Sequence, residues 1–263
     1  MNYSFMTFSC PELDWEGVVA AARRFGYDGV EPRAQARHAH GVELEASAQA
    51  RRAIRNAAEQ AGVAVCCLAT SCRYTATEPA ERQEMLETTR RLIRLARDIG
   101  APAVRVFGGA IPDGMSRQEA IGQVAECLAQ LGPDAQEAGV TLCVETHDSW
   151  CDARHLAQLL QRVDHPSVQA NWDLMHPVRA GMTIDEAWAA LRPHVRHCHF
   201  HDGTHDDAGG LCPVGQGQVD HRRAVELLAA DGYRGFLSGE WIHWEPWEQH
   251  LPRELATMRS YEP

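Results

Sequence analysis

The 263-residue chain contains no lysine, so all 25 of its basic residues are arginine. A Schiff-base aldolase, a pyridoxal-phosphate enzyme with an internal aldimine and a P-loop nucleotide-binding protein each need a lysine amine. The sequence therefore excludes these three classes. A bias in genome composition is the simpler explanation of the absence itself.

The sequence also lacks a long apolar run, and its start, MNYSFMTFSC, has no basic segment of the kind that precedes a signal sequence. We therefore expect a soluble, cytoplasmic protein that does not bind a membrane. Acidic residues outnumber basic ones by 36 to 25, which gives a net charge of −11. Proteins that bind nucleic acid normally carry a clustered basic face, so we expect no nucleic-acid partner.

The nine cysteines include no C-x-x-C pair and are scattered through apolar segments. An odd number of unpatterned cysteines is typical of reduced thiols in a reducing compartment. It argues against both a disulfide framework and a structural zinc site.

Short apolar strands alternate along the chain with helical segments that stop at glycine or proline, which are the usual helix-ending residues. Apolar residues in the helical segments recur at helical spacing, as in 92–99 (LIRLARDI). The strands are expected over 3–9, 27–31, 63–69, 101–107, 140–145, 167–173, 195–201 and 233–240. Eight β-α units in a chain of this length predict an α/β protein, a single-domain (β/α)8 TIM barrel over residues 1–263. An open doubly wound sheet is the alternative, but no GxGxxG motif follows the first strand.

In such a barrel the active site lies at the carboxyl ends of the strands. Four successive strands each bring one metal-binding side chain to this end: Glu145, Asp173, His199 and Glu240. Three carboxylates and one imidazole form an oxygen-rich set that suits Mn²⁺, Mg²⁺ or Co²⁺ better than a structural zinc site. The alternative is that each acid is solvated or paired with an arginine such as Arg105.

The stretch HCHFHDGTH (197–205) places three histidines at every second position. In a strand these side chains share one face. We expect His199 to be a metal ligand and His197 to support it from one layer deeper, with a hydrogen-bonded core histidine as the alternative for His197. We expect His201 and Asp202 to face the substrate, with simple solvation as their alternative.

Other polar residues are expected near the barrel mouth. Arg105 points inward and either clamps a substrate oxygen or balances the acids. His147 follows Glu145 on the inward face, and His38 and His40 lie in the loop after the second strand. Three tryptophans are expected to pack the final helix, with a sugar-stacking wall as the alternative: Trp241, Trp244 and Trp247.

Seven stretches resemble the xylose-isomerase-like TIM-barrel superfamily, which includes sugar-phosphate isomerases and epimerases, ketose 3-epimerases, inosose dehydratase and endonuclease IV. They are GYDGVEPR, APAVRVFGG, CVETHD, NWDLMHP, HCHFHDG, PVGQGQVD and GYRGFLSGEW, spread from Gly26 to Trp241. The resemblance to endonuclease IV is weaker, because that enzyme binds DNA and holds three metals with more histidines.

The resemblance implies one divalent metal ion held by Glu145, Asp173, His199 and Glu240. Mn²⁺ is the first expectation, with Mg²⁺, Co²⁺ or Zn²⁺ as alternatives. It also implies that Glu145 and Glu240 are catalytic and exchange protons with the substrate. The expected substrate-binding residues are His176, which the resemblance supplies, and Arg105, His147, Asp202 and His40. The chain departs from the ketose epimerases at Cys151 and His205, where those enzymes have an acid and an arginine.

These observations predict a divalent-metal-dependent isomerase or epimerase that acts on a sugar, keto-sugar or cyclitol. The expected reaction is proton abstraction next to a carbonyl through a metal-bound enediolate. The alternatives are a metal-dependent dehydratase or lyase on a related substrate, and a non-catalytic accessory subunit of a complex. The expected partner is a small carbohydrate, and association into a homo-oligomer is left open.

Overall fold

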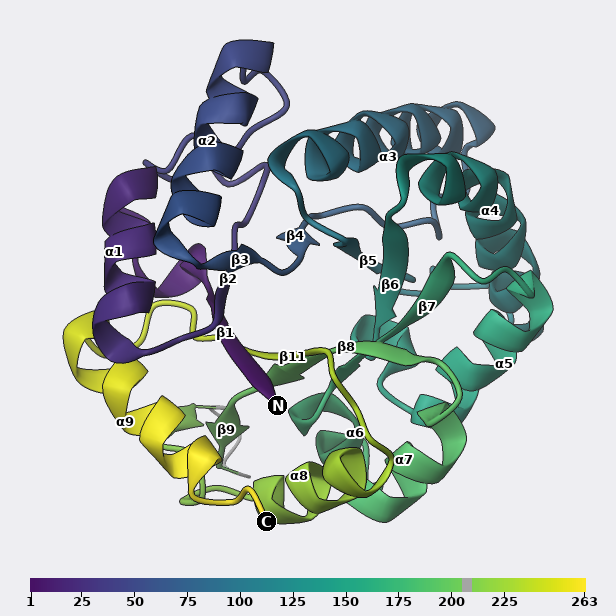
Figure 1. The fold of residues 1–263 in the computed structure, drawn as a ribbon. Helices are drawn as coiled ribbons and strands as arrows, with labels where there is room; N and C mark the ends of the chain where they lie inside the picture. Colours follow the sequence, from purple (N-terminus) through teal and green to yellow (C-terminus); the bar gives the residue numbers. More distant parts are fainter. Residues whose placement is uncertain (205–209) are drawn as a thin grey trace.

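The computed structural model of the protein describes residues 1–204 and 210–263. A parallel sheet curls around a central axis, and the helices form a ring outside it (Figure 1). The strand order in this sheet is β3-β2-β1-β11-β8-β7-β6-β5-β4. Its two end strands, β3 and β4, follow one another directly in the chain, so together they complete the ring. The expected (β/α)8 barrel is confirmed.

The bounds of the elements follow the predicted alternation. The barrel strands are β1 (Asn2–Met6), β2 (Gly29–Glu31), β3 (Ala64–Val65), β4 (Leu68–Ala69), β5 (Ala103–Phe107), β6 (Thr141–Glu145), β7 (Val168–Asp173), β8 (Val195–Phe200) and β11 (Phe236–Gly239). The helices are α1 (Trp15–Phe25), α2 (Ala48–Ala61), α3 (Pro79–Ile99), α4 (Arg117–Ala138), α5 (Ala153–Val163), α6 (Met175–Arg179), α7 (Ile184–Leu191), α8 (His221–Ala230) and α9 (Trp247–Arg259). Two 3₁₀ turns, η1 (Thr7–Ser9) and η2 (Asp148–Trp150), and the short antiparallel pair β9 (Asp202–Gly203) and β10 (Leu211–Cys212) lie in loops.

The helix ends show why the alternation could be read from the sequence. The helices α1, α2, α3 and α4 all end at a glycine in the left-handed conformation, as at Gly100 with φ +83°. Side chains other than glycine rarely adopt this backbone conformation, so glycine ends the helix cleanly. At the other end of α4, Ser116 and Glu119 form a reciprocal capping box.

The strands begin and end within three residues of the expected bounds, and two of them change for a structural reason. The first strand ends at Met6, because Thr7 turns into η1 and its hydroxyl accepts a hydrogen bond from the Arg33 backbone amide. The third strand is broken at Cys66 and Cys67 into β3, which pairs with β2, and β4, which pairs with β5. The two halves of the broken strand therefore pair with different neighbours, β2 on one side and β5 on the other.

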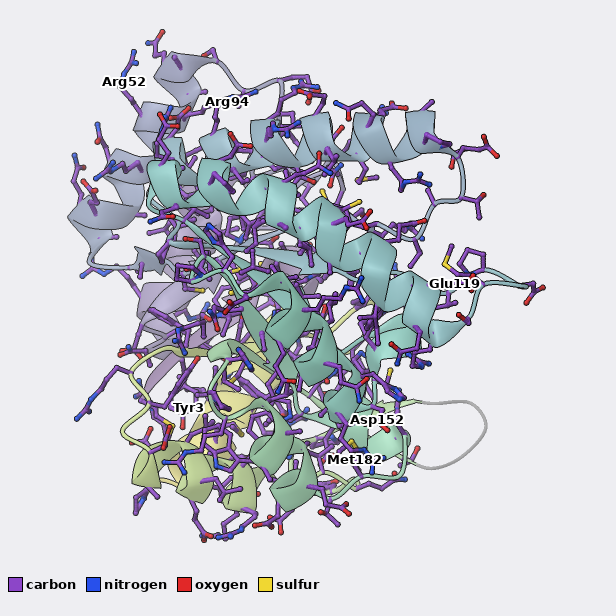
Figure 2. The ribbon with its side chains drawn as sticks, turned by 90° about the vertical axis from the view of Figure 1, so that its right-hand side faces the viewer. Tyr3, Arg52, Arg94, Glu119, Asp152 and Met182 are labelled. Carbon is purple, nitrogen blue, oxygen red and sulfur yellow. The ribbon has the colours of Figure 1, made fainter. Side chains whose placement is uncertain are left out.

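The two ends of the barrel interior hold different kinds of side chain. Near the amino ends of the strands lies a small cluster of Cys66, Cys67, Ala103 and Cys143. Buried polar side chains gather toward the carboxyl ends. In Figure 2, Glu119, Asp152 and Met182 lie at one end of the molecule, beside the starts of α4, α5 and α7. Helices that follow parallel strands start where the strands finish, so this is the end at which an active site is expected.

Within residues 1–204 and 210–263, no helix combines the length and apolar character that a membrane crossing requires.

Candidate metal centre and active site

Four side chains converge at the carboxyl ends of neighbouring strands. Glu145 ends β6, Asp173 ends β7, His199 lies one residue before the end of β8, and Glu240 follows β11. Each offers a ligand atom, and these atoms all lie within 4.8 Å of one another. The pairing of β7 with β8 sets Asp173 beside His199, so the sheet itself holds this part of the cluster. The structure thus brings together all four residues that the sequence indicated as ligands.

The imidazole of His199 lies at the centre of the cluster. Its Nδ1 atom is 2.9 Å from Oε1 of Glu145 and 3.0 Å from Oε2 of Glu240. Burial alone would lower the pKa of His199, but the negative charges of Glu31 and Glu145 outweigh burial and raise this pKa well above its usual range. Burial would raise the pKa of Glu240, yet the hydrogen bond to His199 and its charge lower it to about 2.

The donor set fits a hard divalent cation. Three carboxylates and one imidazole nitrogen face one small volume, and oxygen-rich sets of this kind suit Mn²⁺ or Mg²⁺. Glu145, Asp173 and His199 are almost completely buried. Buried like charges repel one another, so a cation among them would offset a large electrostatic cost.

Glu31, the last residue of β2, is a member of this site that the sequence analysis did not identify. It is fully buried, and both of its carboxylate oxygens lie 3.2 Å from Nε2 of His199. Its Oε2 atom is also 2.8 Å from Nε2 of His197. The motif GYDGVE ends in an inward-facing acid, and this is the signal that could have found it. Glu31 therefore links His197 to His199 through its carboxylate, and the two imidazole rings also lie edge to face.

Arg105 on β5 lies against Glu145. Its Nε atom is 3.3 Å from Oε2 of Glu145, and its Nη1 group donates a 2.8 Å hydrogen bond to the Thr70 carbonyl. Its guanidinium also stacks over the Phe107 ring, 4.2 Å from the centroid. Burial would lower the pKa of Arg105, but Glu145 and Glu240 outweigh burial and raise it. Of the two roles expected for Arg105, this geometry matches the balancing of acid charge.

A cavity of about 240 Å³ opens beside the cluster. Within the described part of the chain it is lined by His147, Met175, His176, Arg179, His201, Leu211, Glu240 and Ile242. The lining includes two of the expected substrate-binding residues, His147 and His176, and it also includes His201. The ring centroids of His147 and His176 are 4.7 Å apart, and those of His176 and His201 are 5.8 Å apart.

His201 is tied to the cluster through Asp173. Its Nε2 atom lies 2.8 Å from Oδ2 of Asp173, while the other oxygen of Asp173 accepts hydrogen bonds from the amides of Met175 and His176. Burial would raise the pKa of Asp173, but His201 and His176 hold it well below its usual range. Asp173 therefore connects the end of β7 both to the first turn of α6 and to His201, which lines the cavity.

Asp202 does not join the cavity. It is fully buried, and its oxygens accept hydrogen bonds at 2.9–3.2 Å from five backbone amides: Gly203, Gly215, Gly217, Gln218 and Val219. A side chain at Gly217 would run into Asp202, so the glycine allows the loop to close over the carboxylate. The expectation that Asp202 faces the substrate is thus corrected: the carboxylate anchors the PVGQGQV loop (213–219).

The ring nitrogens of His40 also bond to other residues of the protein. Its Nε2 atom lies 3.0 Å from the Thr7 hydroxyl, and its Nδ1 atom accepts a 3.0 Å hydrogen bond from the Val42 amide. Both ring nitrogens of His40 thus have protein partners, and burial lowers its pKa to about 3. His38 is only partly buried and lies 3.3 Å from the same hydroxyl. His40 is buried and is not among the described residues that line the cavity, which corrects the expected substrate contact.

Two further expectations concern the loops. Cys151 is half-buried and its thiol donates to the Asp148 carbonyl. His205 lies outside the described residues.

Trp241 stacks with Trp244, and Trp247 packs edge-on against Phe25 of α1. These contacts match the expected packing role of the tryptophans.

Comparison with protein families assigns the chain to a class. Residues 19–261 match the family model described as the xylose isomerase-like TIM barrel, so the chain belongs to this family and the expected resemblance is confirmed. The L-ribulose-5-phosphate 3-epimerase UlaE of Salmonella typhi is 26% identical over 256 residues, which cover 94% of this chain and 88% of that protein.

Solved structures share the architecture over almost the whole chain. The probable 3-DHS dehydratase AsbF of Bacillus anthracis has a TM-score of 0.82 and 20% identity, with 98% of this chain and 99% of that chain covered. The 3-keto-D-glucoside 4-epimerase YcjR of E. coli has a TM-score of 0.82 and 17% identity, with 99% of each chain covered. At these identities the likeness shows the fold.

Proposed function

We propose that the protein is a divalent-metal-dependent isomerase or epimerase that acts on a keto-sugar or cyclitol, with Mn²⁺ as its metal. One observation carries this proposal: three carboxylates and one imidazole converge within 4.8 Å at the edge of a cavity that three histidines line. The curated relative named above is a sugar-phosphate epimerase, and one of the similar structures is an epimerase of a keto-glucoside, which supports this substrate class.

The geometry gives the two glutamates distinct positions. Glu145 reaches Nδ1 of His199 from β6, and Glu240 reaches it from β11. A bound divalent cation would act as a Lewis acid toward a carbonyl and its neighbouring hydroxyl. One glutamate would then take the proton from the carbon next to the carbonyl, and the other would return a proton from its own side. The Nε atom of Arg105, 3.3 Å from Oε2 of Glu145, helps to hold the Glu145 carboxylate in place.

The cavity fits a small polyhydroxylated substrate. Its volume of about 240 Å³ is below the range of roughly 300–1,000 Å³ that is usual for drug-sized ligands, which favours a monosaccharide-sized molecule. His147, His176 and His201 present ring nitrogens that can hydrogen-bond hydroxyl groups. The nine free cysteines support the prediction that the protein works in a reducing compartment such as the cytoplasm.

The test is proton exchange with solvent. The Mn²⁺-loaded protein is incubated in D₂O with a panel of ketoses, keto-cyclitols and their phosphates, and recovered sugars are analysed by NMR and mass spectrometry. We expect one carbon-bound deuterium next to the carbonyl, and its loss in Glu145→Gln and Glu240→Gln. Glu245→Gln is the matched control. Glu245 lies in the loop after β11 and pairs with Arg253 of α9, away from the four converging side chains. A metal-loaded protein that exchanges no proton with any panel member would contradict the proposal.

The same experiment separates the alternatives. Proton removal next to a carbonyl can also expel a β-hydroxyl, and one structurally similar protein is described as a dehydratase. A dehydratase or lyase would give a product lighter by one water. An accessory subunit would show turnover only after a second protein is added.

A further inference from the structure

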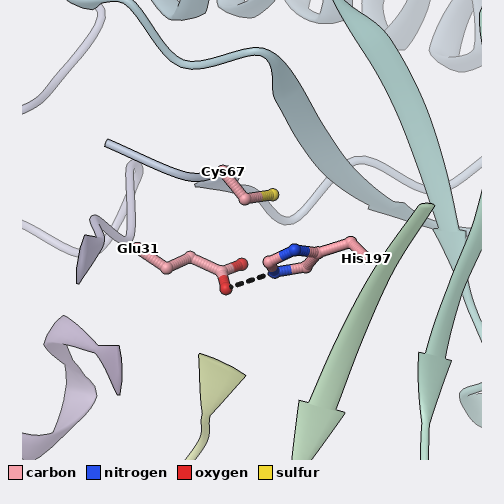
Figure 3. Close-up of side chains that lie close together, drawn as sticks. All are labelled: Glu31, Cys67 and His197. Atoms are coloured by element: carbon pink, nitrogen blue, oxygen red, sulfur yellow. Dashed lines mark hydrogen bonds and ion pairs between the residues drawn. The ribbon is translucent and has the colours of Figure 1, made fainter. Parts of the chain in front are cut away.

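A carboxylate lies beneath the ligand cluster, inside the barrel. Glu31, which ends β2, is fully buried and contacts His197 and His199, two histidines of β8. Figure 3 shows its contact with His197. Its Oε2 atom lies 2.8 Å from Nε2 of His197, and both oxygens lie 3.2 Å from Nε2 of His199. The rings of the two histidines are 5.3 Å apart and nearly perpendicular, at 83°. Glu31 is therefore the bridge between two layers of one strand.

We propose that Glu31 is a positioning residue, which holds His199 with Nδ1 turned toward Glu145 and Glu240 and with its proton on Nε2. His197 in turn fixes the carboxylate of Glu31. This inference rests on the proposed metal site, because it concerns how one ligand of that site is oriented.

The argument starts from the two nitrogens of His199. A neutral imidazole carries one N–H and one lone pair, and only the nitrogen with the lone pair can bind a metal. Nε2 faces the two oxygens of Glu31, which can only accept a hydrogen bond when ionised. The proton of the neutral ring therefore belongs on Nε2, which leaves the lone pair of Nδ1 facing Glu145 and Glu240. Partner carboxylates of this kind fix ring orientation and raise ligand basicity.

The second step concerns Glu31 itself. A buried carboxylate is costly unless it is paired or hydrogen-bonded. His197 supplies the shorter of its contacts, at 2.8 Å, and is itself almost completely buried. Loss of His197 would leave Glu31 with His199 as its remaining imidazole partner and with more freedom to move. His197 thus affects the proposed metal site indirectly, through the position of Glu31.

Cys67 provides a matched control. Its thiol belongs to the same buried group as Glu31 and His197, and the three side chains lie close together in Figure 3. If Glu31 only positions His199, removal of the Cys67 sulfur leaves the metal centre unchanged. If Glu31, Cys67 and His197 were instead ligands of a second metal, Cys67→Ala would remove one bound metal per chain.

The experiment measures Mn²⁺ affinity by chelator competition and records the visible spectrum of the Co²⁺-loaded protein. We compare wild type with Glu31→Gln, Glu31→Met, His197→Gln and Cys67→Ala, after circular dichroism of each metal-free protein. We expect Glu31→Met to weaken affinity by about 10–100-fold and to change the Co²⁺ spectrum. Glu31→Gln and His197→Gln should give smaller losses, and Cys67→Ala none. Nitrogen-15 NMR of the wild type loaded with Zn²⁺, which is diamagnetic, should show His199 protonated at Nε2.

Three outcomes would overturn the inference. Folded Glu31 variants with wild-type affinity and an unchanged Co²⁺ spectrum would show that Glu31 does not position the ligand. A second metal that is lost in Cys67→Ala would make Glu31 a ligand. A wild-type protein that binds no metal would remove the proposed function as well, which distinguishes that failure from the first two.

Discussion

Nδ1 of His199 lies 3.0 Å from Oε2 of Glu240, and this contact joins β8 to the residue that follows β11. The same nitrogen lies 2.9 Å from Glu145 on β6. Two carboxylates thus converge on one nitrogen of His199, and a cation bound there would be attracted by both. The predictions below test the partners that hold this arrangement in place.

Replacement of Arg105 should destabilise the metal-free protein strongly. Arg105→Met removes the arginine that pairs with the buried Glu145, and breaking a buried ion pair in this way costs about 3–5 kcal/mol. Urea unfolding of the metal-free protein measures this cost, and Mn²⁺ should reduce it by replacing the lost positive charge. Arg223→Met, which breaks the exposed pair with Asp185, is the control and should cost less than about 1 kcal/mol. Equal losses in the two variants would contradict this account.

Replacement of Asp202 should loosen the 213–219 loop without affecting the metal. Asp202→Asn cannot satisfy five backbone amides, and we expect a loss of about 2–3 kcal/mol in the free energy of unfolding. Hydrogen exchange at Gly217 and Val219 should rise. Mn²⁺ affinity should stay within about twofold of wild type, because Asp202 is outside the ligand cluster. A large loss of Mn²⁺ affinity would contradict this prediction and would show that Asp202 contributes to metal binding.

His40 should make the protein less stable in mild acid. Burial lowers its pKa in the folded protein from 6.5 to about 3, whereas the unfolded chain keeps the ordinary value. Between these two pKa values the unfolded chain binds a proton that the folded protein does not. Its contribution to stability is therefore complete above about pH 6.5 and decreases by about 1.4 kcal/mol per pH unit as the pH falls toward 3.

The measurement is urea unfolding at pH 8 and pH 5 for wild type and His40→Gln. The difference between the two proteins should change by about 2 kcal/mol across this range, with wild type losing more. A difference that does not depend on pH would show that His40 titrates normally in the folded protein. His194→Gln is a control at a partly buried histidine, where burial also lowers the pKa and the effect should be smaller.

The sequence was sufficient to predict the barrel and the four side chains that converge at its carboxyl end, because both follow from local patterns. Glycine ends the helices, as at Gly100, and alternation along a strand decides which residues face inward. The carboxyl end of a strand then defines the active end of a barrel, so Glu145 and Asp173 could be assigned without knowing their partners.

The missed features depend on contacts between distant parts of the chain. Glu31 and His199 are 168 residues apart, and no local pattern gives the register that brings β2 and β8 to the same level. Asp202 resembles a mouth residue in sequence, but the loop from Gly215 folds back onto it. His40 and Thr7 are 33 residues apart in the sequence and meet at 3.0 Å. Such pairings become visible only when the barrel is closed.

The most direct test of the central claim is the metal content of the purified protein after Mn²⁺ loading and desalting, compared between wild type and Glu240→Ala. Glu240 is one of the four proposed ligands, and Glu240→Ala removes one carboxylate from the cluster while Asp173 and Arg105 stay in the sequence. The account predicts about one Mn²⁺ per chain in wild type and a large loss in the variant, with Glu245→Ala unchanged. A well-folded wild type without bound metal, or a Glu240→Ala variant that retains it fully, would contradict the account.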